Sequence, residues 1–236
     1  MNAVREKLAR GVTRGLWQNL PGPEAAELAA RAGFDWILID GEHGAWDTGD
    51  IRRRLIAAPD AIVRVPTNES WLLKQVLDLG AWTVLVPMVQ GAADARAAVA
   101  ACRYPPAGRR GIGSAVSRAG MYSLDPGYEA RANAEVSVWV QVESRAALAD
   151  LEGIAAVEGV DCVFLGPGDL SADMGCAPSD PEVIAALEDA IARLIAVDTP
   201  AGIFAADPWR WVRLGARAVA MGSDAIVLAQ GLRALL

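Results

Sequence analysis

The sequence predicts an α/β protein folded as a (β/α)₈ TIM barrel, and three observations carry that prediction. Short β-rich runs alternate with alanine-rich segments of helical periodicity, which is the pattern of βα units around a parallel sheet. Eight such pairs can be drawn, and 236 residues come close to the usual barrel length of about 250. Glycine also recurs where a helix passes into the next strand. We expect one domain over residues 1–236, with a doubly wound open sheet as the alternative.

The expected elements follow one another regularly along the chain. The strands are Leu16 to Asn19, Trp36 to Asp40, Ala61 to Val65, Val84 to Met88, Val136 to Glu143, Cys162 to Leu165, Gly202 to Ala205 and Ala218 to Met221. The helices between them begin near Pro23, Asp47, Glu69, Ala92, Arg145, Asp180, Asp207 and Ser223. The glycines after helices, where the backbone commonly needs a left-handed residue, are Gly33, Gly80, Gly159 and Gly215.

The segment from Tyr104 to Ala134 departs from this regularity. It is too long for an ordinary loop between a strand and a helix, and it is rich in glycine and arginine near its start. Long structured loops in compact domains are usually functional. Its composition suits either an anionic ligand or a contact between subunits.

The chain is acidic, which limits its partners. Its formal net charge of -7 and its pI near 4.8 repel phosphate backbones, so we expect no nucleic-acid partner. No apolar run approaches the roughly 18 residues of a membrane span, and the first residues lack the apolar core of a secretory signal. Cys102, Cys162 and Cys176 lack the spacing of a disulfide framework or a zinc site. We therefore expect a cytoplasmic protein with reduced thiols.

Polar residues collect at the expected strand ends, which form the reactive face of a parallel βα architecture. The single histidine, His43, stands in Asp40-Gly41-Glu42-His43 directly after an apolar run. Imidazole titrates near neutral pH, so His43 is the natural candidate for proton transfer, and we count Asp40 with it as catalytic. A hydrogen-bonded structural histidine is the alternative. Arg64 stands at the end of the next strand.

Two carboxylates indicate a metal site. Gln141 and Glu143 lie two residues apart, so strand alternation places both on one face. A buried carboxylate is costly unless it is metal-bound or paired, and a salt bridge to an arginine such as Arg64 is the alternative for Glu143. Asp169 comes one βα unit later and can meet Glu143 at the barrel mouth, although it could instead cap the following helix. Such a pair suits Mg²⁺ or another hard divalent cation.

Six motifs, spread over most of the chain, occur together. They are Leu38-Ile39-Asp40-Gly41-Glu42-His43, Lys74-Gln75-Val76-Leu77-Asp78-Leu79-Gly80-Ala81, Val86-Pro87-Met88-Val89, Tyr104-Pro105-Pro106-Ala107-Gly108-Arg109-Arg110-Gly111, Val140-Gln141-Val142-Glu143 and Phe164-Leu165-Gly166-Pro167-Gly168-Asp169-Leu170-Ser171. In combination they resemble the metal-dependent pyruvate aldolases of the HpcH/HpaI family. The resemblance implies a carbon-carbon lyase that reversibly cleaves 4-hydroxy-2-oxo acids into pyruvate, or hydroxypyruvate, and an aldehyde.

The resemblance also implies roles for residues around the substrate. Glu143 and Asp169 resemble the ligands of a divalent metal, which would be Mg²⁺, Mn²⁺ or Co²⁺. Gln141, the backbone at Gly168, and Asp169 resemble the contacts to the 2-oxo acid, together with Arg64, which also looks like the group that stabilises enolate charge. Gly168 stands where alanine is frequent in the family, which leaves the preferred aldehyde open.

The remaining implied roles concern proton transfer and assembly. His43 looks like the base, and Asp78 looks like the carboxylate that raises its basicity, from a neighbouring subunit. Family members commonly form hexamers and exchange the last helix between subunits, so the same is expected here.

Lysine placement distinguishes this chemistry from the other aldolase mechanism, which forms a Schiff base with an activated lysine. Lys7 precedes the first expected strand, and Lys74 falls inside an amphipathic helix, so neither stands at a strand end. Metal assistance is therefore favoured. Two rival functions remain: a lyase for acyl-CoA thioesters such as malyl- or citryl-CoA, and a non-catalytic barrel that binds a 2-oxo acid.

Overall fold

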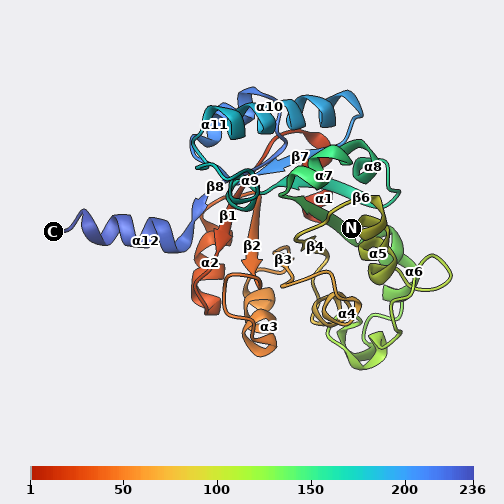
Figure 1. Cartoon of the computed structure of the whole chain (residues 1–236). Coiled ribbons are helices and arrows are strands. Elements are labelled where there is room, and N and C mark those ends of the chain that lie inside the picture. Colours follow the sequence, from red (N-terminus) through yellow and green to blue (C-terminus); the bar gives the residue numbers. More distant parts are fainter. Residues whose placement is uncertain (1) are drawn as a thin grey trace.

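Eight parallel strands close into a barrel in the computed structural model, which describes residues 2–236 (Figure 1). Each strand pairs with the next along the chain, and the first pairs with the last to complete the ring. The strands are β1 (Thr13–Gln18), β2 (Trp36–Asp40), β3 (Ile62–Arg64), β4 (Thr83–Val86), β5 (Ser137–Val142), β6 (Val160–Leu165), β7 (Ala201–Ile203) and β8 (Ala218–Ser223). This closed ring confirms the predicted (β/α)₈ barrel and rules out the open sheet.

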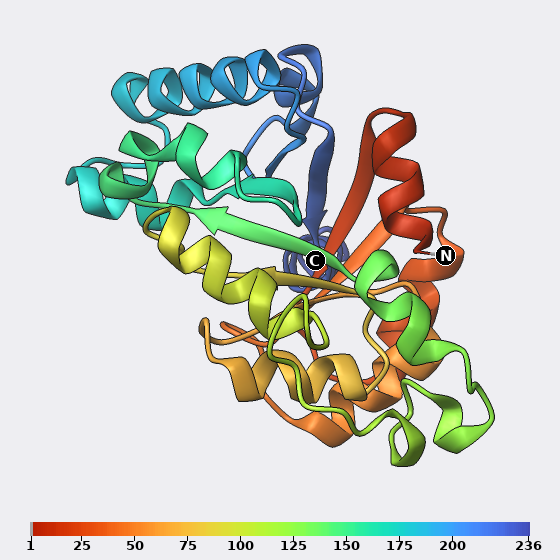
Figure 2. The same ribbon diagram turned by 90° about the vertical axis from the view of Figure 1, so that its right-hand side faces the viewer.

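Helices surround the barrel, as Figures 1 and 2 show from two directions. Those that alternate with the strands are α2 (Pro23–Arg31), α3 (Thr48–Ala57), α4 (Ser70–Asp78), α5 (Ala92–Cys102), α7 (Arg145–Ala149), α8 (Leu151–Ala155), α9 (Pro167–Met174), α10 (Pro181–Ala196), α11 (Pro208–Arg213) and α12 (Asp224–Arg233). The long segment after α5 contains the short helices η1 (Ser114–Val116), η2 (Met121–Ser123) and α6 (Tyr128–Glu135). A further helix, α1 (Ala3–Arg10), precedes β1.

Local sequence signals fix several helix ends. Asp47, Asp207 and Ser223, which the sequence placed at helix starts, accept backbone N–H hydrogen bonds as N-caps of α3, α11 and α12. The glycines predicted after helices all adopt the left-handed φ that a side chain would strain: Gly33, Gly80, Gly159 and Gly215. These signals therefore position the strands that follow.

Aromatic side chains fill the inside of the barrel. The rings of Trp36 and Trp139 meet edge to face with centroids 5.8 Å apart, and Phe164 stacks on Trp139 at 6.3 Å. Val4 and Leu8 of α1 join this cluster. Because Asn2, the N-cap residue of α1, donates hydrogen bonds to the Trp82 carbonyl and the Thr83 hydroxyl at the start of β4, α1 covers the end of the barrel where the strands begin. The opposite end, where the strands finish, stays open for a site.

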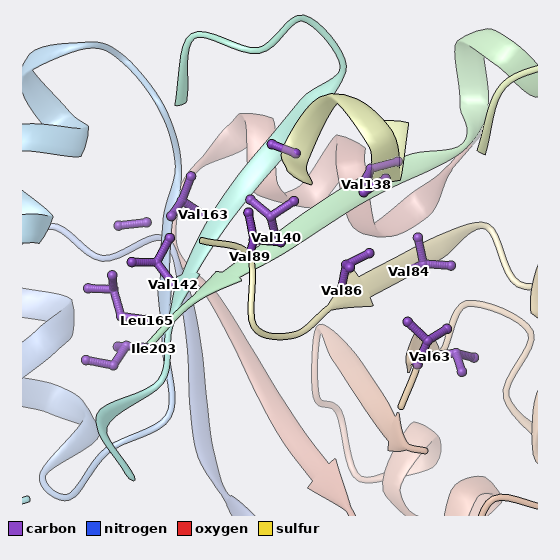
Figure 3. Close-up of a cluster of buried hydrophobic side chains, with 14 of the residues drawn as sticks. Val63, Val84, Val86, Val89, Val138, Val140, Val142, Val163, Leu165 and Ile203 are labelled. Atoms are coloured by element: carbon purple, nitrogen blue, oxygen red, sulfur yellow. The ribbon is translucent and has the colours of Figure 1, made fainter. Parts of the chain in front are cut away.

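A second apolar layer lies between the barrel and its helices. Strand alternation turns Val138, Val140 and Val142 of β5 outward, while Trp139 and Gln141 face the interior. Figure 3 shows such outward valine, leucine and isoleucine side chains on β3 to β7 gathered in one cluster. Alternation along β5 thus places the side chain of Gln141 in the barrel interior.

Several elements differ from the sequence expectation. Most strand ends are shifted by one to three residues, Met88 lies beyond the end of β4, and α6 and α9 were not expected. β1 begins at Thr13 and not at Leu16, because the Thr13 amide donates to the Arg217 carbonyl at 2.6 Å and the strand is extended by pairing with β8. α1 was not predicted, since half of its eight residues are charged and it buries only Val4 and Leu8. Both elements depend on contacts with distant parts of the chain.

The last helix, α12, projects away from the barrel in Figure 1 and is seen end-on in Figure 2. Its apolar residues Ile226, Val227, Leu228 and Leu232 are about half exposed in the single chain. Within residues 2–236 no helix has the length and apolar character needed to cross a bilayer. Exchange of this helix between subunits stays a prediction.

Gly15 offers a test of interior packing. A Cβ built on it would lie 2.2 Å from ring atoms of Trp36, which also donates a hydrogen bond to Thr13. We expect Gly15→Ala to lower the free energy of unfolding by about 1–3 kcal/mol, because the ring must move in a filled core. Urea denaturation measures this change. Gly111→Ala, whose Cβ would make ordinary contacts, is the control, and equal stability of both variants would contradict this packing.

Candidate active site

A cavity of about 360 Å³ opens where the strands end. The predicted site residues that line it come from β2, β3, β5 and the start of α9, and they are Asp40, His43, Arg64, Gln141, Gly168 and Asp169. Trp17 and Asn19 from the end of β1, Phe204 after β7 and Ser223 at the end of β8 complete the wall. The closed barrel therefore brings together most of the residues chosen from strand ends.

The Asp40 carboxylate is fully buried and is surrounded by donors. Its Oδ2 atom accepts hydrogen bonds from Trp17 Nε1 at 3.1 Å, Asn19 Nδ2 at 2.7 Å and Arg64 Nη2 at 2.8 Å. The donors belong to the ends of β1 and β3, on either side of β2. Asp40 thus ties three strand ends together.

The other oxygen of Asp40 holds the turn that carries the histidine. Oδ1 accepts from Arg64 Nε at 2.9 Å and from the backbone amides of Glu42 at 3.0 Å and His43 at 3.2 Å. An aspartate that accepts from amides two and three residues later makes an Asx-type turn, which fixes the backbone without regular secondary structure. His43 is exposed at the cavity wall, so its position depends on this turn.

The electrostatics of Asp40 favour the ionised form. Burial alone would raise the pKa of its carboxyl, but the hydrogen bonds and charge of Arg64, with the bonds from Trp17 and the Glu42 amide, outweigh it. The pKa of Asp40 therefore lies below its ordinary value. The ionised Asp40 is the counterion that lets the guanidinium of Arg64 lie almost buried beside the cavity.

Arg64 has partners on both sides. Its Nη1 lies 2.6 Å from Glu42 Oε2 and 3.4 Å from Gln141 Oε1, and its guanidinium lies 4.9 Å from the centre of the Trp17 ring. The ion pairs of Arg64 therefore run to Asp40 and Glu42. Glu143, for which a salt bridge to Arg64 was the alternative role, is bonded by other groups.

Glu143 is 2% exposed and has both carboxylate oxygens engaged. Oε1 accepts from the Met88 amide at 2.7 Å, and Oε2 accepts a short bond from Gln141 Nε2, as expected for side chains on one strand face. Met88 has φ of 54°, a left-handed conformation that costs a non-glycine residue roughly 1–2 kcal/mol. Strained backbone after β4 thus supplies a donor to a buried carboxylate.

Negative charges gather around Glu143. Burial, together with the charges of Glu42 and Asp169, raises its pKa to about 7, although the Met88 hydrogen bond and the charge of Arg64 act in the opposite direction. Burial likewise raises the pKa of Glu42, against the effect of Arg64. A carboxylate that is hard to ionise next to other carboxylates is stabilised by a cation. This part of the site fits a metal ion chemically.

Gly166 makes room for that arrangement. A Cβ built on it would lie 2.4 Å from Glu143 Oε2 and 2.8 Å from Gln141 Nε2, so any side chain would collide with the carboxylate. The absence of a side chain lets the start of α9, which carries Asp169, pass close to Glu143. In residues 2–236 no group of three His, Cys, Asp or Glu side chains is arranged to hold a metal by itself. A pair of carboxylates would thus leave coordination positions for water and substrate oxygens.

Asp169 does not cap its helix. α9 begins at Pro167 with Gly166 as its N-cap residue, and Asp169 lies in the first turn with its side chain exposed to the cavity. The capping alternative is therefore wrong. A carboxylate in the first turn is still favoured by the helix dipole.

Asp78 lies apart from the other predicted residues. It lines a different hollow, at the end of α4, where its Oδ1 accepts from Arg110 Nη2 at 2.7 Å. Arg110 is almost buried, bonds the Tyr128 hydroxyl and lies 4.5 Å from the centre of the Tyr104 ring. The long segment after α5 therefore fixes the Asp78 carboxylate away from His43 of the same chain.

Sequence reasoning missed several residues around the cavity. Trp17 and Asn19 bond Asp40, Glu42 pairs with Arg64, and the Met88 amide bonds Glu143. Asn19 ends a predicted strand and Glu42 lies in the turn that carries His43. Their positions at strand ends could therefore have identified both as site residues. The left-handed backbone of Met88 could not be predicted, because methionine does not favour that conformation.

Comparison with known proteins identifies the family. The HpcH/HpaI aldolase/citrate lyase profile matches residues 13–230. The chain belongs to this family. A 4-hydroxy-2-oxo-heptane-1,7-dioate aldolase of Salmonella heidelberg (strain SL476) is 47% identical over 244 residues, which cover 99% of this chain and 93% of that relative.

Solved structures of HpcH/HpaI relatives share the barrel. The crystal structure of a HpcH/HpaI aldolase/citrate lyase family protein from Burkholderia cenocepacia J2315 has a TM-score of 0.95 and 35% identity, over 100% of this chain and 98% of that one. A citrate lyase β subunit from M. tuberculosis, complexed with oxaloacetate and magnesium, has a TM-score of 0.61 and 17% identity over 91% of this chain and 92% of that one. The second likeness shows the fold alone.

The raised pKa of Glu143 predicts how stability depends on pH. After chelator treatment, the folded chain keeps the Glu143 proton between pH 4.5 and about 7, while the unfolded chain loses it. The folded state then binds more protons, so its free energy of unfolding should fall as the pH rises, by up to about 3 kcal/mol. Urea titrations at several pH values measure this fall. Glu143→Gln should lack this component, and identical pH profiles of the two proteins would contradict the shift.

Proposed function

We propose that this HpcH/HpaI protein is a divalent-metal-dependent aldolase that cleaves 4-hydroxy-2-oxo acids reversibly into pyruvate, or hydroxypyruvate, and an aldehyde. One observation carries the proposal. One cavity is lined by the Asp40-bound Arg64, by His43 and by Asp169, and Glu143 lies beside it, hydrogen-bonded to the lining Gln141. The 47% identity to a 4-hydroxy-2-oxo-heptane-1,7-dioate aldolase supports the same reaction class.

Glu143 and Asp169 would hold the metal in this proposal. When bound, the cation supplies fixed positive charge that favours the enolate form of the 2-oxo acid. Gln141 and the backbone at Gly168 and Asp169 would bind the 2-oxo acid, since all line the cavity beside Glu143. Mg²⁺, Mn²⁺ and Co²⁺ all suit a site of carboxylate oxygens.

His43 and Arg64 would carry the proton and charge changes. During cleavage His43 accepts the proton of the 4-hydroxyl, the C3–C4 bond breaks, and its electron pair forms the enolate while the aldehyde leaves. Arg64 stabilises the enolate oxygen as a permanently charged donor, and Asp40 keeps that donor in place. Protonation of the enolate at C3 then gives the 2-oxo acid.

Assembly belongs to the same proposal. Asp78 lies away from His43 of its own chain, and α12 exposes apolar residues, so a second copy would supply Asp78 and cover α12 in a homohexamer. Each chain would contribute one catalytic domain over residues 1–236. The thiols of Cys102, Cys162 and Cys176 are free, which fits the cytoplasm.

The rival functions have less support. The citrate lyase β subunit is only 17% identical, so it supports the fold and no acyl-CoA activity. A non-catalytic barrel would have no need of an Arg64 held by Asp40 beside the cavity. Release of pyruvate from a 4-hydroxy-2-oxo acid separates these functions from the aldolase.

Metal removal is the direct test of the cofactor. Prolonged dialysis against EDTA should abolish cleavage of a 4-hydroxy-2-oxo acid, because no fixed cation would favour the enolate, and added Mg²⁺, Mn²⁺ or Co²⁺ should restore it. Pyruvate release, coupled to a dehydrogenase, measures the rate. Borohydride with pyruvate should trap no adduct. Full activity of the stripped enzyme would contradict metal assistance.

Three substitutions test the residue roles. Glu143→Gln and Asp169→Asn should weaken metal binding by about tenfold or more in calorimetry, because each removes a charged ligand. His43→Ala should bind metal and pyruvate nearly as the wild type does, yet lose about 10²–10⁴-fold in aldol turnover. Unchanged metal affinity in both carboxylate variants would show that the ligands are assigned wrongly.

A further inference from the structure

The long segment after α5 packs against α3 and α4 and encloses a cavity of about 430 Å³, separate from the active-site cavity. We call it the basic hollow, because the cationic side chains of Arg52, Lys74 and Arg118 line it. Among residues 2–236, Asp78 is the only carboxylate in its lining, and the ion pair of Asp78 runs to Arg110. A chain with a net charge of -7 therefore has an excess of positive charge at this place.

The cations of the basic hollow have neutral partners. Arg52 donates to the Tyr122 hydroxyl at 3.0 Å, and Arg118 donates to two backbone carbonyls at 3.0 and 3.2 Å. Within residues 2–236, neither arginine forms an ion pair, and Lys74 forms none either. Hydrogen bonds to neutral oxygens leave the charge of a guanidinium uncompensated, and a carboxylate would add a stronger, charge-assisted bond. The hollow is thus suited to an anion.

The active-site cavity offers no such group to a second carboxylate of the substrate. Among the described residues that line it, Arg64 is the only arginine or lysine, and its ion pairs run to Asp40 and Glu42. The proposed chemistry also commits Arg64 to the enolate oxygen. A carboxylate on the chain that extends from C4 would therefore need a cation from outside this cavity.

Helix α4 relates the basic hollow to that chain. Lys74 and Asp78 lie four residues apart on α4, so they are neighbours on one face of the helix, with Cβ atoms about 5–6 Å apart. In the proposed assembly a neighbour's Asp78 meets His43, and His43 lies beside C4 because it accepts the proton of the 4-hydroxyl. A copy that docks in this way brings its Lys74 within about one helical turn of the substituent on C4.

Exposed apolar side chains also line the basic hollow. Trp71 and Tyr122 are each about half exposed, and Val116 is largely exposed. Tryptophan, tyrosine and arginine are enriched in protein interfaces relative to other surfaces. The hollow thus combines positive charge with the kind of surface that a second copy would cover.

We propose that the basic hollow of one copy binds a carboxylate at the far end of the aldehyde half of the substrate, which is held in the active-site cavity of a second copy. Lys74 is the principal ligand of that carboxylate. The inference rests on the proposed aldolase function and on the proposed assembly. It makes the enzyme selective for 4-hydroxy-2-oxo acids whose C4 substituent ends in an anionic group.

Two matched substrates test this selectivity on the metal-loaded enzyme. One has a C4 substituent that ends in a carboxylate, and the other has the same substituent as the neutral amide. The measured quantity is the ratio of kcat/KM for the acid to kcat/KM for the amide. We expect a ratio of about ten or more, because hydrogen bonds to charged groups contribute more than neutral ones. A ratio of one or less overturns the proposal.

Variants of the two lysines of the chain locate the effect. Lys74 is exposed, so its substitution leaves the core intact. Lys74→Gln should lower the acid-to-amide ratio by about fivefold or more, whereas Lys74→Arg keeps the charge and should largely keep the ratio. Lys7→Gln is the matched control, because Lys7 lies on α1 and donates to the Asp35 carbonyl. An unchanged ratio in Lys74→Gln, or an equal fall in Lys7→Gln, overturns the assignment.

Mixed assemblies show which copy supplies the lysine. Co-expressed His43→Ala and Lys74→Gln chains carry different affinity tags and are purified through both. In these assemblies every site with a histidine belongs to a copy that lacks Lys74. We expect the ratio to rise above that of Lys74→Gln alone, because a His43→Ala neighbour contributes its own Lys74. A ratio that stays at the Lys74→Gln value, or a monomeric wild type, overturns the proposal.

The outcomes separate this proposal from the aldolase function. If the wild type cleaves neither substrate, the aldolase function fails and the inference fails with it. If the wild type cleaves both substrates and the ratio does not depend on Lys74, the aldolase function stands and the basic hollow does not bind the substrate.

Discussion

Hydrogen bonds from the ends of β1 and β3 and from the histidine turn all end on the carboxylate of Asp40. Taking a carboxylate and a guanidinium out of water together is costly unless their geometry is good and the remaining sites are bonded. Both conditions are met for Asp40 and Arg64. The position of His43 therefore depends on this one buried pair, and so does the positive charge that Arg64 would offer to the enolate in the proposed reaction.

Beside the cavity, carboxylates repel one another around Glu143. Glu143 is buried near Glu42 and Asp169, and it is held by a strained amide at Met88 and by Gln141. These carboxylates destabilise one another in the absence of a cation, which is the usual condition of a site prepared for one. The barrel remains folded despite this repulsion, because its aromatic interior and its apolar outer layer hold the strands in place independently of the site.

Two features of the single chain bear on the proposed assembly. Asp78 is held by Arg110 away from His43, and the apolar residues of α12 are exposed beyond the barrel. Burial of apolar surface is the main force for association. In the proposed hexamer, the contact between copies that covers α12 would also bring a neighbour's Asp78 to the histidine, so the active site and the subunit contacts would depend on each other.

The sequence by itself determined the barrel, its strands and most of the cavity residues, because alternation, helix caps and left-handed glycines are local and leave direct marks on residue types. Strand-end position was enough to select Asp40, His43, Arg64, Gln141 and Asp169. Only the tertiary structure decided which donors bond Asp40, that Glu143 is bonded by a strained amide, and that cations from α3, α4 and the segment after α5 line one hollow. Those contacts join residues far apart in the chain, and their geometry follows from closure of the barrel rather than from any local pattern.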